Sequence, residues 1–173
     1  MSSEGLVHIY TGDGKGKTTA AVGLAVRAAG AGLRVMFAQF LKGQPTGEIE
    51  PLKKLGVIVI RGEAVTKFIL NMNPAEIEEC RRAQLGTLEA VRNGINKNDV
   101  IILDEIFGAI STGMIEMSDI VSLIEKKPRG AELVLTGRDA PARLIGLADY
   151  VSDIKAVKHP YDKGITARKG IEY

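Results

Sequence analysis

Residues 11–18 read Thr-Gly-Asp-Gly-Lys-Gly-Lys-Thr, a segment with the composition of a phosphate-binding loop. In such a loop successive backbone N–H groups point toward a phosphate, and the helix that follows adds partial positive charge at its N-terminus. Lys17 supplies a mobile full charge, and Thr18 supplies a hydroxyl suited to a Mg²⁺ ion. Thr11 stands where the usual pattern has its first glycine, and Lys15 adds a second lysine. The segment predicts a nucleoside triphosphate site.

Two carboxylates, Asp104 and Glu105, directly follow the apolar run at residues 100–103. An acidic side chain at the end of a strand faces Mg²⁺ directly or through water, because a hard cation prefers oxygen ligands. We therefore expect Thr18, Asp104 and Glu105 to hold the metal. The alternative is that Asp104 caps the next helix and Glu105 is solvated. The sequence leaves open which carboxylate contacts the ion first.

Arg138 follows a further apolar run, within Thr-Gly-Arg-Asp at residues 136–139. The glycine allows the backbone to approach a ligand closely, and an arginine pairs bidentately with phosphate oxygens. Lys17 and Arg138 are thus the candidate catalytic residues. The competing interpretation is a solvated arginine in a loop that starts a helix, with Asp139 as the cap, and the residues alone leave both open.

Other notable residues favour structural roles. The stretch from residue 155 to 173 is locally basic, and such a tail is usually solvated. His8, inside a predicted strand, favours a packed or sheet-edge residue over a ligand. Cys80 falls on an apolar helical stripe and predicts a small buried hydrophobe.

These residues must be positioned by strands and helices that alternate along the chain. The phosphate-binding loop lies between a β-prone run at 6–10 and a helical pattern at 18–29, so a chance glycine- and lysine-rich turn is disfavoured. The expected strands are 6–10, 33–40, 57–60, 100–103, 133–136 and 150–157, and the expected helices are 18–29, 73–93, 118–126 and 141–148. The β-branched run at 57–60 favours a strand buried on both faces.

This alternation predicts an α/β fold with three layers, in which helices cover both faces of a mostly parallel sheet. We expect the P-loop NTPase (RecA-like) variant of that fold, as a single domain over residues 1–173. Ligands of such sheets bind at the carboxyl ends of the strands, where the candidate residues stand.

Composition agrees with a compact enzyme. The chain has 173 residues, a net charge of +2 and one cysteine, which excludes an internal disulfide and fits a reducing compartment. The small net charge gives no reason to expect nucleic acid as a partner. No signal peptide or membrane-spanning run is evident, so we expect a cytoplasmic protein without a membrane partner.

Taken together, the motifs resemble the P-loop class of ATP:cob(I)alamin adenosyltransferases, the corrinoid adenosyltransferases. The resemblance runs from about residue 5 to 173. It rests on the loop with its missing first glycine and extra lysine, and on further segments in matching order: Gln39-Phe40-Leu41-Lys42-Gly43, Gly47-Glu48, Leu103-Asp104-Glu105, Thr136-Gly137-Arg138, Leu147-Ala148-Asp149, Val157-Lys158-His159-Pro160 and Gly170-Ile171-Glu172-Tyr173.

The resemblance implies that Co(I) of a reduced corrinoid attacks C5′ of ATP, the adenosyl group moves to cobalt, and triphosphate leaves. It also implies that ATP lies along the loop in the reverse of the usual sense, with Mg²⁺ as cofactor. The residues expected to bind the substrates are Thr11, Gly12, Asp13, Gly14, Lys15, Gly16, Lys17, Thr18, Thr19 and Phe68. An electron-donating reductase and a second copy of the chain, as a homodimer, are the implied protein partners.

The chain departs from the family pattern at residues 62–72. Some members have a phenylalanine and a tryptophan there that displace the lower cobalt ligand, whereas this chain has no tryptophan and offers Phe68. Because the first strand is expected to begin by about residue 6, we do not expect the N-terminal extension found in longer members. A P-loop kinase or ATPase that cleaves the β–γ bond, and a non-catalytic corrinoid-binding module switched by nucleotide, are the competing interpretations.

Overall fold

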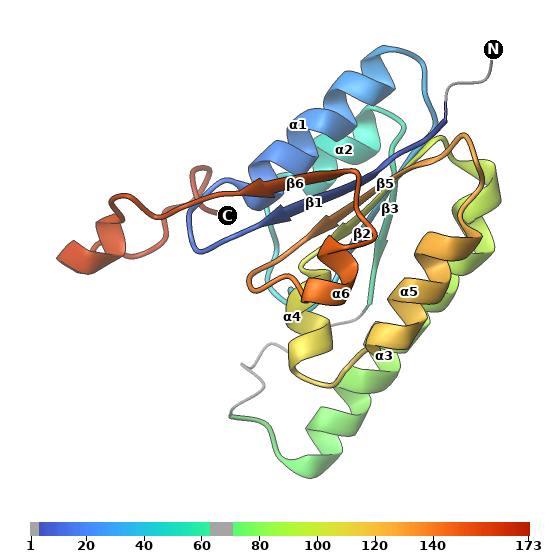
Figure 1. Cartoon of the computed structure of the whole chain (residues 1–173). Helices are drawn as coiled ribbons and strands as arrows, with labels where there is room; N and C mark the ends of the chain where they lie inside the picture. The colour runs from blue at the N-terminus through green and yellow to red at the C-terminus, as the bar shows by residue number, and fades with distance from the viewer. Residues whose placement is uncertain (1–3, 63–70) are drawn as a thin grey trace.

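The computed structural model describes residues 4–62 and 71–173. In this part of the chain six parallel strands form one sheet in the order β3-β2-β4-β5-β1-β6 (Figure 1). The strands are β1 (Val7–Thr11), β2 (Val35–Gln39), β3 (Ile58–Arg61), β4 (Val100–Asp104), β5 (Glu132–Thr136) and β6 (Tyr150–Asp153). The helices are α1 (Lys17–Gly30), α2 (Ile49–Lys54), α3 (Pro74–Gly94), α4 (Ile106–Ser111), α5 (Met117–Lys126) and α6 (Ala142–Ile145), with 3₁₀ turns η2 (Ile95–Lys97) and η3 (Pro160–Lys163).

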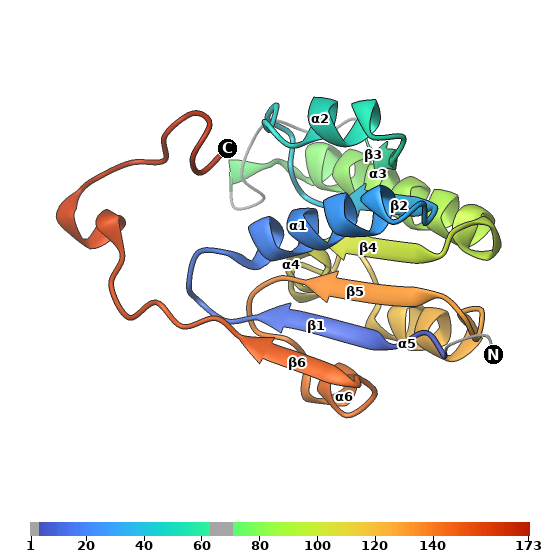
Figure 2. The same ribbon diagram turned by 90° about the horizontal axis from the view of Figure 1, so that it is seen from above.

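The sheet is the middle of three layers. Helices α1 and α2 cover one face, and α3, α4, α5 and α6 lie on the other (Figures 1 and 2). Strand β4 shows why both faces are apolar: Ile102 packs with the α1 and α2 side, while Ile101 and Leu103 pack with α3 and α5. Successive side chains of a strand point to opposite faces, so a central strand of such a sheet is apolar throughout. The predicted α/β fold class is confirmed.

Helix α3 begins where its sequence predicts. The Asn73 side chain accepts a hydrogen bond from the N–H of Glu76 at 3.0 Å, and the Glu76 carboxylate accepts one from the N–H of Asn73 at 2.9 Å. Pro74 occupies the first turn, where its missing N–H costs nothing. Cys80 is buried under this helix, as its place on the apolar stripe predicted.

Two local predictions were wrong, and one helix was not predicted. Strand β3 is an edge strand rather than one buried on both faces, and Ile58 is 50% exposed. The last strand ends at Asp153 instead of residue 157, and helix α4 was not predicted. A β-branched run reports β propensity but not the position of a strand in the sheet, which depends on distant pairing.

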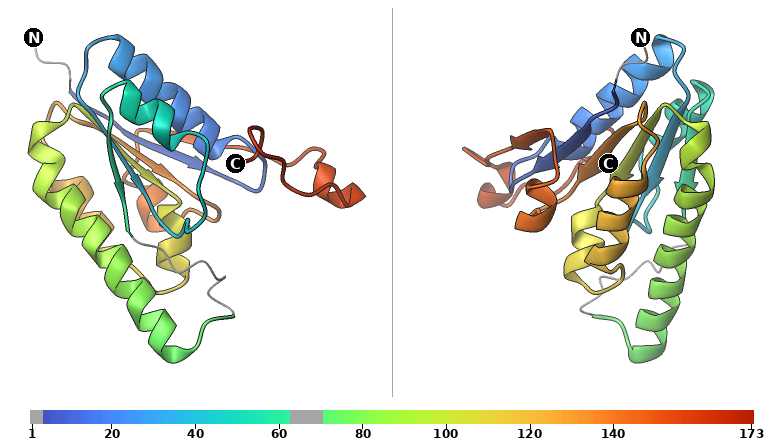
Figure 3. Two further views of the ribbon diagram at one scale, coloured as in Figure 1. Left: turned by 180° about the vertical axis from the view of Figure 1, so that it is seen from behind. Right: turned by 45° about the vertical axis from the view of Figure 1, so that its right-hand side comes forward.

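The carboxyl ends of the strands meet at one edge of the sheet. Gln39 is the register partner of Asp104, and Thr11 is that of Asp153. The chain after β6 leaves the sheet and returns toward α1, so that its C-terminal residues approach the same edge (Figures 2 and 3).

In the described residues no helix is both long enough and apolar enough to cross a membrane.

Candidate nucleotide site at the carboxyl edge of the sheet

The phosphate-binding loop turns through glycines between β1 and α1. Gly12 has φ 98° and Gly16 has φ 133°, in the left-handed region that favours glycine. Lys17 is 7% exposed, and its Nζ donates to the carbonyls of Gly12 at 2.5 Å and Gly14 at 2.8 Å. Burial lowers the pKa of Lys17, and the Glu105 carboxylate partly opposes that shift. The ammonium group is therefore held over the loop by two of its carbonyls.

The glycines of the loop also permit close packing against the end of β6. The Gly14 N–H donates to the Ile154 carbonyl at 2.7 Å. A Cβ atom on Gly12 would lie 2.4 Å from Oδ1 of Asp153. Thr11 still belongs to β1, and its hydroxyl accepts a hydrogen bond from the N–H of Ala140 at 3.1 Å. Thr11 lines neither of the two cavities at this edge of the sheet.

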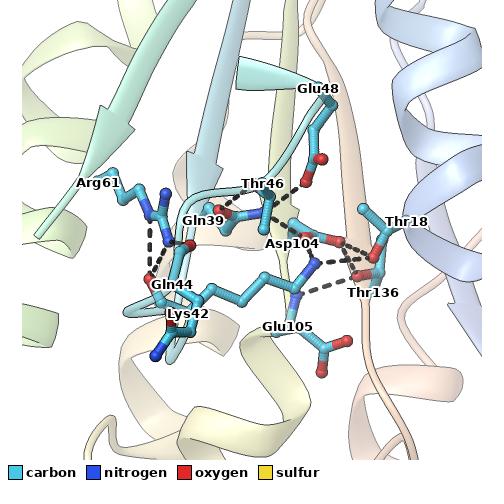
Figure 4. Close-up of polar contacts among 10 residues, drawn as sticks. All are labelled: Thr18, Gln39, Lys42, Gln44, Thr46, Glu48, Arg61, Asp104, Glu105 and Thr136. Carbon is cyan, nitrogen blue, oxygen red and sulfur yellow. Dashed lines mark hydrogen bonds and ion pairs between the residues drawn. The ribbon is translucent and has the colours of Figure 1, made fainter. Parts of the chain in front are cut away.

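Asp104 is the centre of a buried polar cluster (Figure 4). Its side chain is fully buried, and Oδ1 accepts from the hydroxyls of Thr18 at 2.9 Å and Thr136 at 2.8 Å. Its Oδ2 accepts from the Gln39 amide at 3.2 Å and from Lys42 Nζ at 2.9 Å. The predicted neighbours Thr18 and Asp104 are thus in direct contact.

Glu105 has a different environment, although it is the next residue. It adopts a left-handed conformation with φ 60°, and its N–H donates to the Thr136 hydroxyl at 3.0 Å. Figure 4 shows its carboxylate pointing away from that of Asp104. Burial, and then the Asp104 charge, raise the pKa of Glu105. Helix α4 starts without a side-chain cap, so the helix-cap alternative for Asp104 is not supported.

A magnesium ion fits the donor set at Thr18 and Asp104. Their hydroxyl and carboxylate oxygens lie side by side, and Mg²⁺ is usually held by one or two protein oxygens together with substrate phosphates and water. Within residues 4–62 and 71–173, no three His, Cys, Asp or Glu side chains are grouped as metal ligands. An ion here would therefore depend on the phosphates for much of its coordination.

Thr18 opens onto a cavity of about 300 Å³ in front of the loop, whereas Asp104 lies buried behind it. The cavity brings together most of the predicted site residues and some residues that were assigned no role. It is lined by Asp13, Gly14, Lys15, Gly16, Lys17, Thr18, Thr19, Lys42, Glu105, Arg138, His159, Ile171 and Glu172. An adjoining cavity of about 490 Å³ shares Thr18, Thr19, Lys42, Ile171 and Glu172, and extends to Gly47 and Tyr173.

Arg138 lies in the wall of the first cavity. Asp139 has φ 51° and precedes α6 by several residues, so the structure does not support Asp139 as the cap of that helix. Phe68 lies outside the described residues. His8 contacts Glu132 at 2.9 Å and stacks 4.7 Å from the ring of Tyr150, which confirms a packed position near the sheet edge.

Sequence reasoning assigned no role to Lys42 or to the C-terminal residues of the cavity. Lys42 follows β2 by three residues, so the rule that ligands bind after strand ends offered a signal. His159, Ile171 and Glu172 stand in segments that carry the family resemblance, but no strand or α-helix follows β6 in the structure, so local patterns did not place them at the site. The Glu172 carboxylate approaches Lys15 Nζ at 3.9 Å.

Comparison with known proteins identifies relatives of this chain. The "Corrinoid adenosyltransferase" of Escherichia coli K12 is 32% identical over 100% of this chain and 88% of its own, and that of a Sinorhizobium species is 34% identical over 98% of this chain and 81% of its own. A solved KaiC-like protein, PH0186 from Pyrococcus horikoshii, shares the fold with a TM-score of 0.50 at 18% identity, over 87% of this chain and 73% of its own.

The sequence pattern of one family matches residues 3–173, and it is described as ATP:corrinoid adenosyltransferase BtuR/CobO/CobP. The match covers the phosphate-binding loop, the Asp104 cluster and the C-terminal residues of the cavity. This chain belongs to the ATP:corrinoid adenosyltransferase family.

Proposed function

We propose that this chain, as one domain over residues 1–173, transfers the 5′-deoxyadenosyl group of ATP to the reduced cobalt of a corrinoid. The observation that carries the proposal is the family match along the chain, joined to a cavity that gathers phosphate-binding groups. A kinase or ATPase would also use the loop and Asp104. It would not explain why the match continues to the C-terminus.

The reaction forms a carbon–cobalt bond and breaks a carbon–oxygen bond. Co(I) supplies the electron pair that attacks C5′ and becomes Co(III), while the triphosphate leaves with the electrons of the C5′–O bond. Co(I) is itself a strong nucleophile, so no protein base is required. The protein must then position the two substrates and stabilise the negative charge that develops on the triphosphate.

The cationic side chains of the cavity suit that task. Lys17 and the loop amides bind phosphate oxygens, Lys15 extends the positive charge along the loop, and Arg138 adds a further positive charge to the cavity wall. Thr18 and Asp104 would hold Mg²⁺, which would offset the charge of the triphosphate. Glu105 faces the cavity and lies outside that metal contact.

The corrinoid side of the site is proposed from the family resemblance. Phe68 takes the place of the aromatic pair that displaces the lower cobalt ligand, and a reductase supplies the electron that converts Co(II) to Co(I). We further propose a cytoplasmic homodimer. Strand β6 is exposed along its whole length and forms an edge of the sheet, which supports an assembly through that edge.

The test is a product analysis with Mg·ATP and chemically reduced corrinoid under anaerobic conditions. We expect adenosylcorrinoid and triphosphate in equal amounts, measured by absorbance and phosphate chromatography. ADP and phosphate would instead indicate a kinase or ATPase. Nucleotide binding without turnover would indicate a binding module.

A further inference from the structure

Lys42 occupies the place where the proposed metal would bind. Its Nζ lies 2.9 Å from Oδ2 of Asp104 and 3.3 Å from the hydroxyl oxygen of Thr18. These two residues are the oxygen donors that fit Mg²⁺. The lysine ammonium therefore bridges the same pair that a divalent cation would bridge (Figure 4).

Asp104 needs a cation because it is fully buried. A buried carboxylate without a charged partner is strongly unfavourable, and hydroxyl and amide donors offset only part of that cost. In the described part of the chain Lys42 is the only basic side chain within 4 Å of the Asp104 carboxylate. Lys17, which is buried, donates to loop carbonyls instead.

The fold fixes the backbone from which Lys42 reaches Asp104. Arg61 on β3 donates to the carbonyl of Lys42 at 2.9 Å and also to that of Gln44. Leu41 adopts a left-handed conformation with φ 57°, and its N–H donates to the buried Gln84 side chain at 3.0 Å. Contacts from two further elements, β3 and α3, thus hold this turn in place.

A lysine and a divalent cation cannot share this position. Two like charges within about 4 Å repel strongly in a partly buried site. Free Mg²⁺ would have to displace the lysine from Asp104 and would leave it only the charge of the Glu105 carboxylate, which lines the same cavity. Mg·ATP brings its own negative charge, and Lys42 lines both cavities, so its side chain has a phosphate partner within the same site.

We propose that Lys42 is a built-in counter-cation that occupies the metal position in the nucleotide-free protein, excludes free divalent cations from it, and moves to the triphosphate when the metal enters with the nucleotide. The last step rests on the proposed function, whereas the first two depend only on Thr18, Asp104 and Lys42. The metal then binds together with ATP rather than before it.

The test measures binding of Mn²⁺ alone, without nucleotide or corrinoid, from the electron paramagnetic resonance signal of the free ion. We expect the wild-type protein to bind Mn²⁺ weakly and Lys42→Met to bind it about tenfold more tightly, or more. Adding Asp104→Asn to Lys42→Met should abolish the gain. Mn²⁺ should also raise the melting temperature of Lys42→Met but not that of the wild type.

Lys15→Met is the matched control, because it removes the same charge from the same cavity without touching Thr18 or Asp104. Its Mn²⁺ affinity should change little. An equal gain in both lysine variants, or none in folded Lys42→Met, overturns the proposal. If Lys42→Met does not fold, Arg61→Met loosens the turn instead and should also tighten Mn²⁺ binding. The Mn²⁺ measurement uses no substrate, so its result can be interpreted even if the adenosyl-transfer assay fails.

Discussion

At the scale of single residues, Lys17 is held by contacts that a phosphate would replace. Its ammonium group is buried against the carbonyls of Gly12 and Gly14. We predict that Lys17→Ala weakens Mg·ATP binding by about 1.5–3 kcal/mol, because a charge-assisted contact to phosphate is lost. Calorimetric titration measures the affinity, with Lys53→Ala as an exposed control outside the cavity. Unchanged affinity in a folded variant would contradict the assignment.

The adjacent carboxylates of Asp104 and Glu105 should have different functions. Asp104 contacts Thr18, whereas Glu105 points away from that pair. We predict that Asp104→Asn weakens Mg²⁺-dependent ATP binding at least about tenfold, since an amide keeps the size but loses the charge that holds a hard cation. Glu105→Gln should retain the metal dependence. Titrations at several Mg²⁺ concentrations compare the two, and equal losses would place both carboxylates at the metal.

At the scale of elements, Arg34 and Asp99 join the starts of β2 and β4. The Asp99 carboxylate accepts from the Arg34 guanidinium at 2.7 Å and from its backbone N–H at 2.8 Å, and these hydrogen bonds lower the pKa of Asp99 to about 2. Because the folded-state pKa lies below the ordinary value of 3.8, the carboxylate stabilises the fold above that value. This contribution is lost as the pH falls toward 2.

We therefore predict that Asp99→Asn removes part of the acid dependence of stability. Between about pH 4 and pH 2 its urea midpoint should fall less steeply than that of the wild type. The effect is small because the pair is exposed to solvent. Glu78→Gln on the exposed side of α3 is the control, and parallel pH profiles for Asp99→Asn and the wild type would refute the linkage.

At the scale of the whole molecule, the C-terminal segment closes a site whose other walls come from the phosphate-binding loop and from the ends of β2, β4 and β5. His159, Ile171 and Glu172 line the cavity, but none of residues 159–173 is buried. We predict that ending the chain at Lys158 leaves the melting temperature of the sheet nearly unchanged. Mg·ATP affinity should fall about tenfold. Calorimetry measures both quantities, and full affinity in the shortened chain would exclude the tail from binding.

The sequence by itself determined the features that depend on neighbouring residues. The phosphate-binding loop, the boundaries of α3 and the apolar run before Asp104 are local patterns, because backbone propensity, capping and side-chain period act over a few residues. The fold class followed from their alternation, and the family from the motifs in order. The roles of Lys17, Arg138 and Phe68 remain predictions.

Only the tertiary structure decided which distant residues meet. Lys42 and Asp104 are 62 positions apart in the sequence, and the neighbouring positions of β2 and β4 bring them into contact. The same sheet order makes β3 an edge strand. Strand pairing and tail placement depend on packing between segments far apart in the chain, and single-sequence patterns do not encode that packing in any local window.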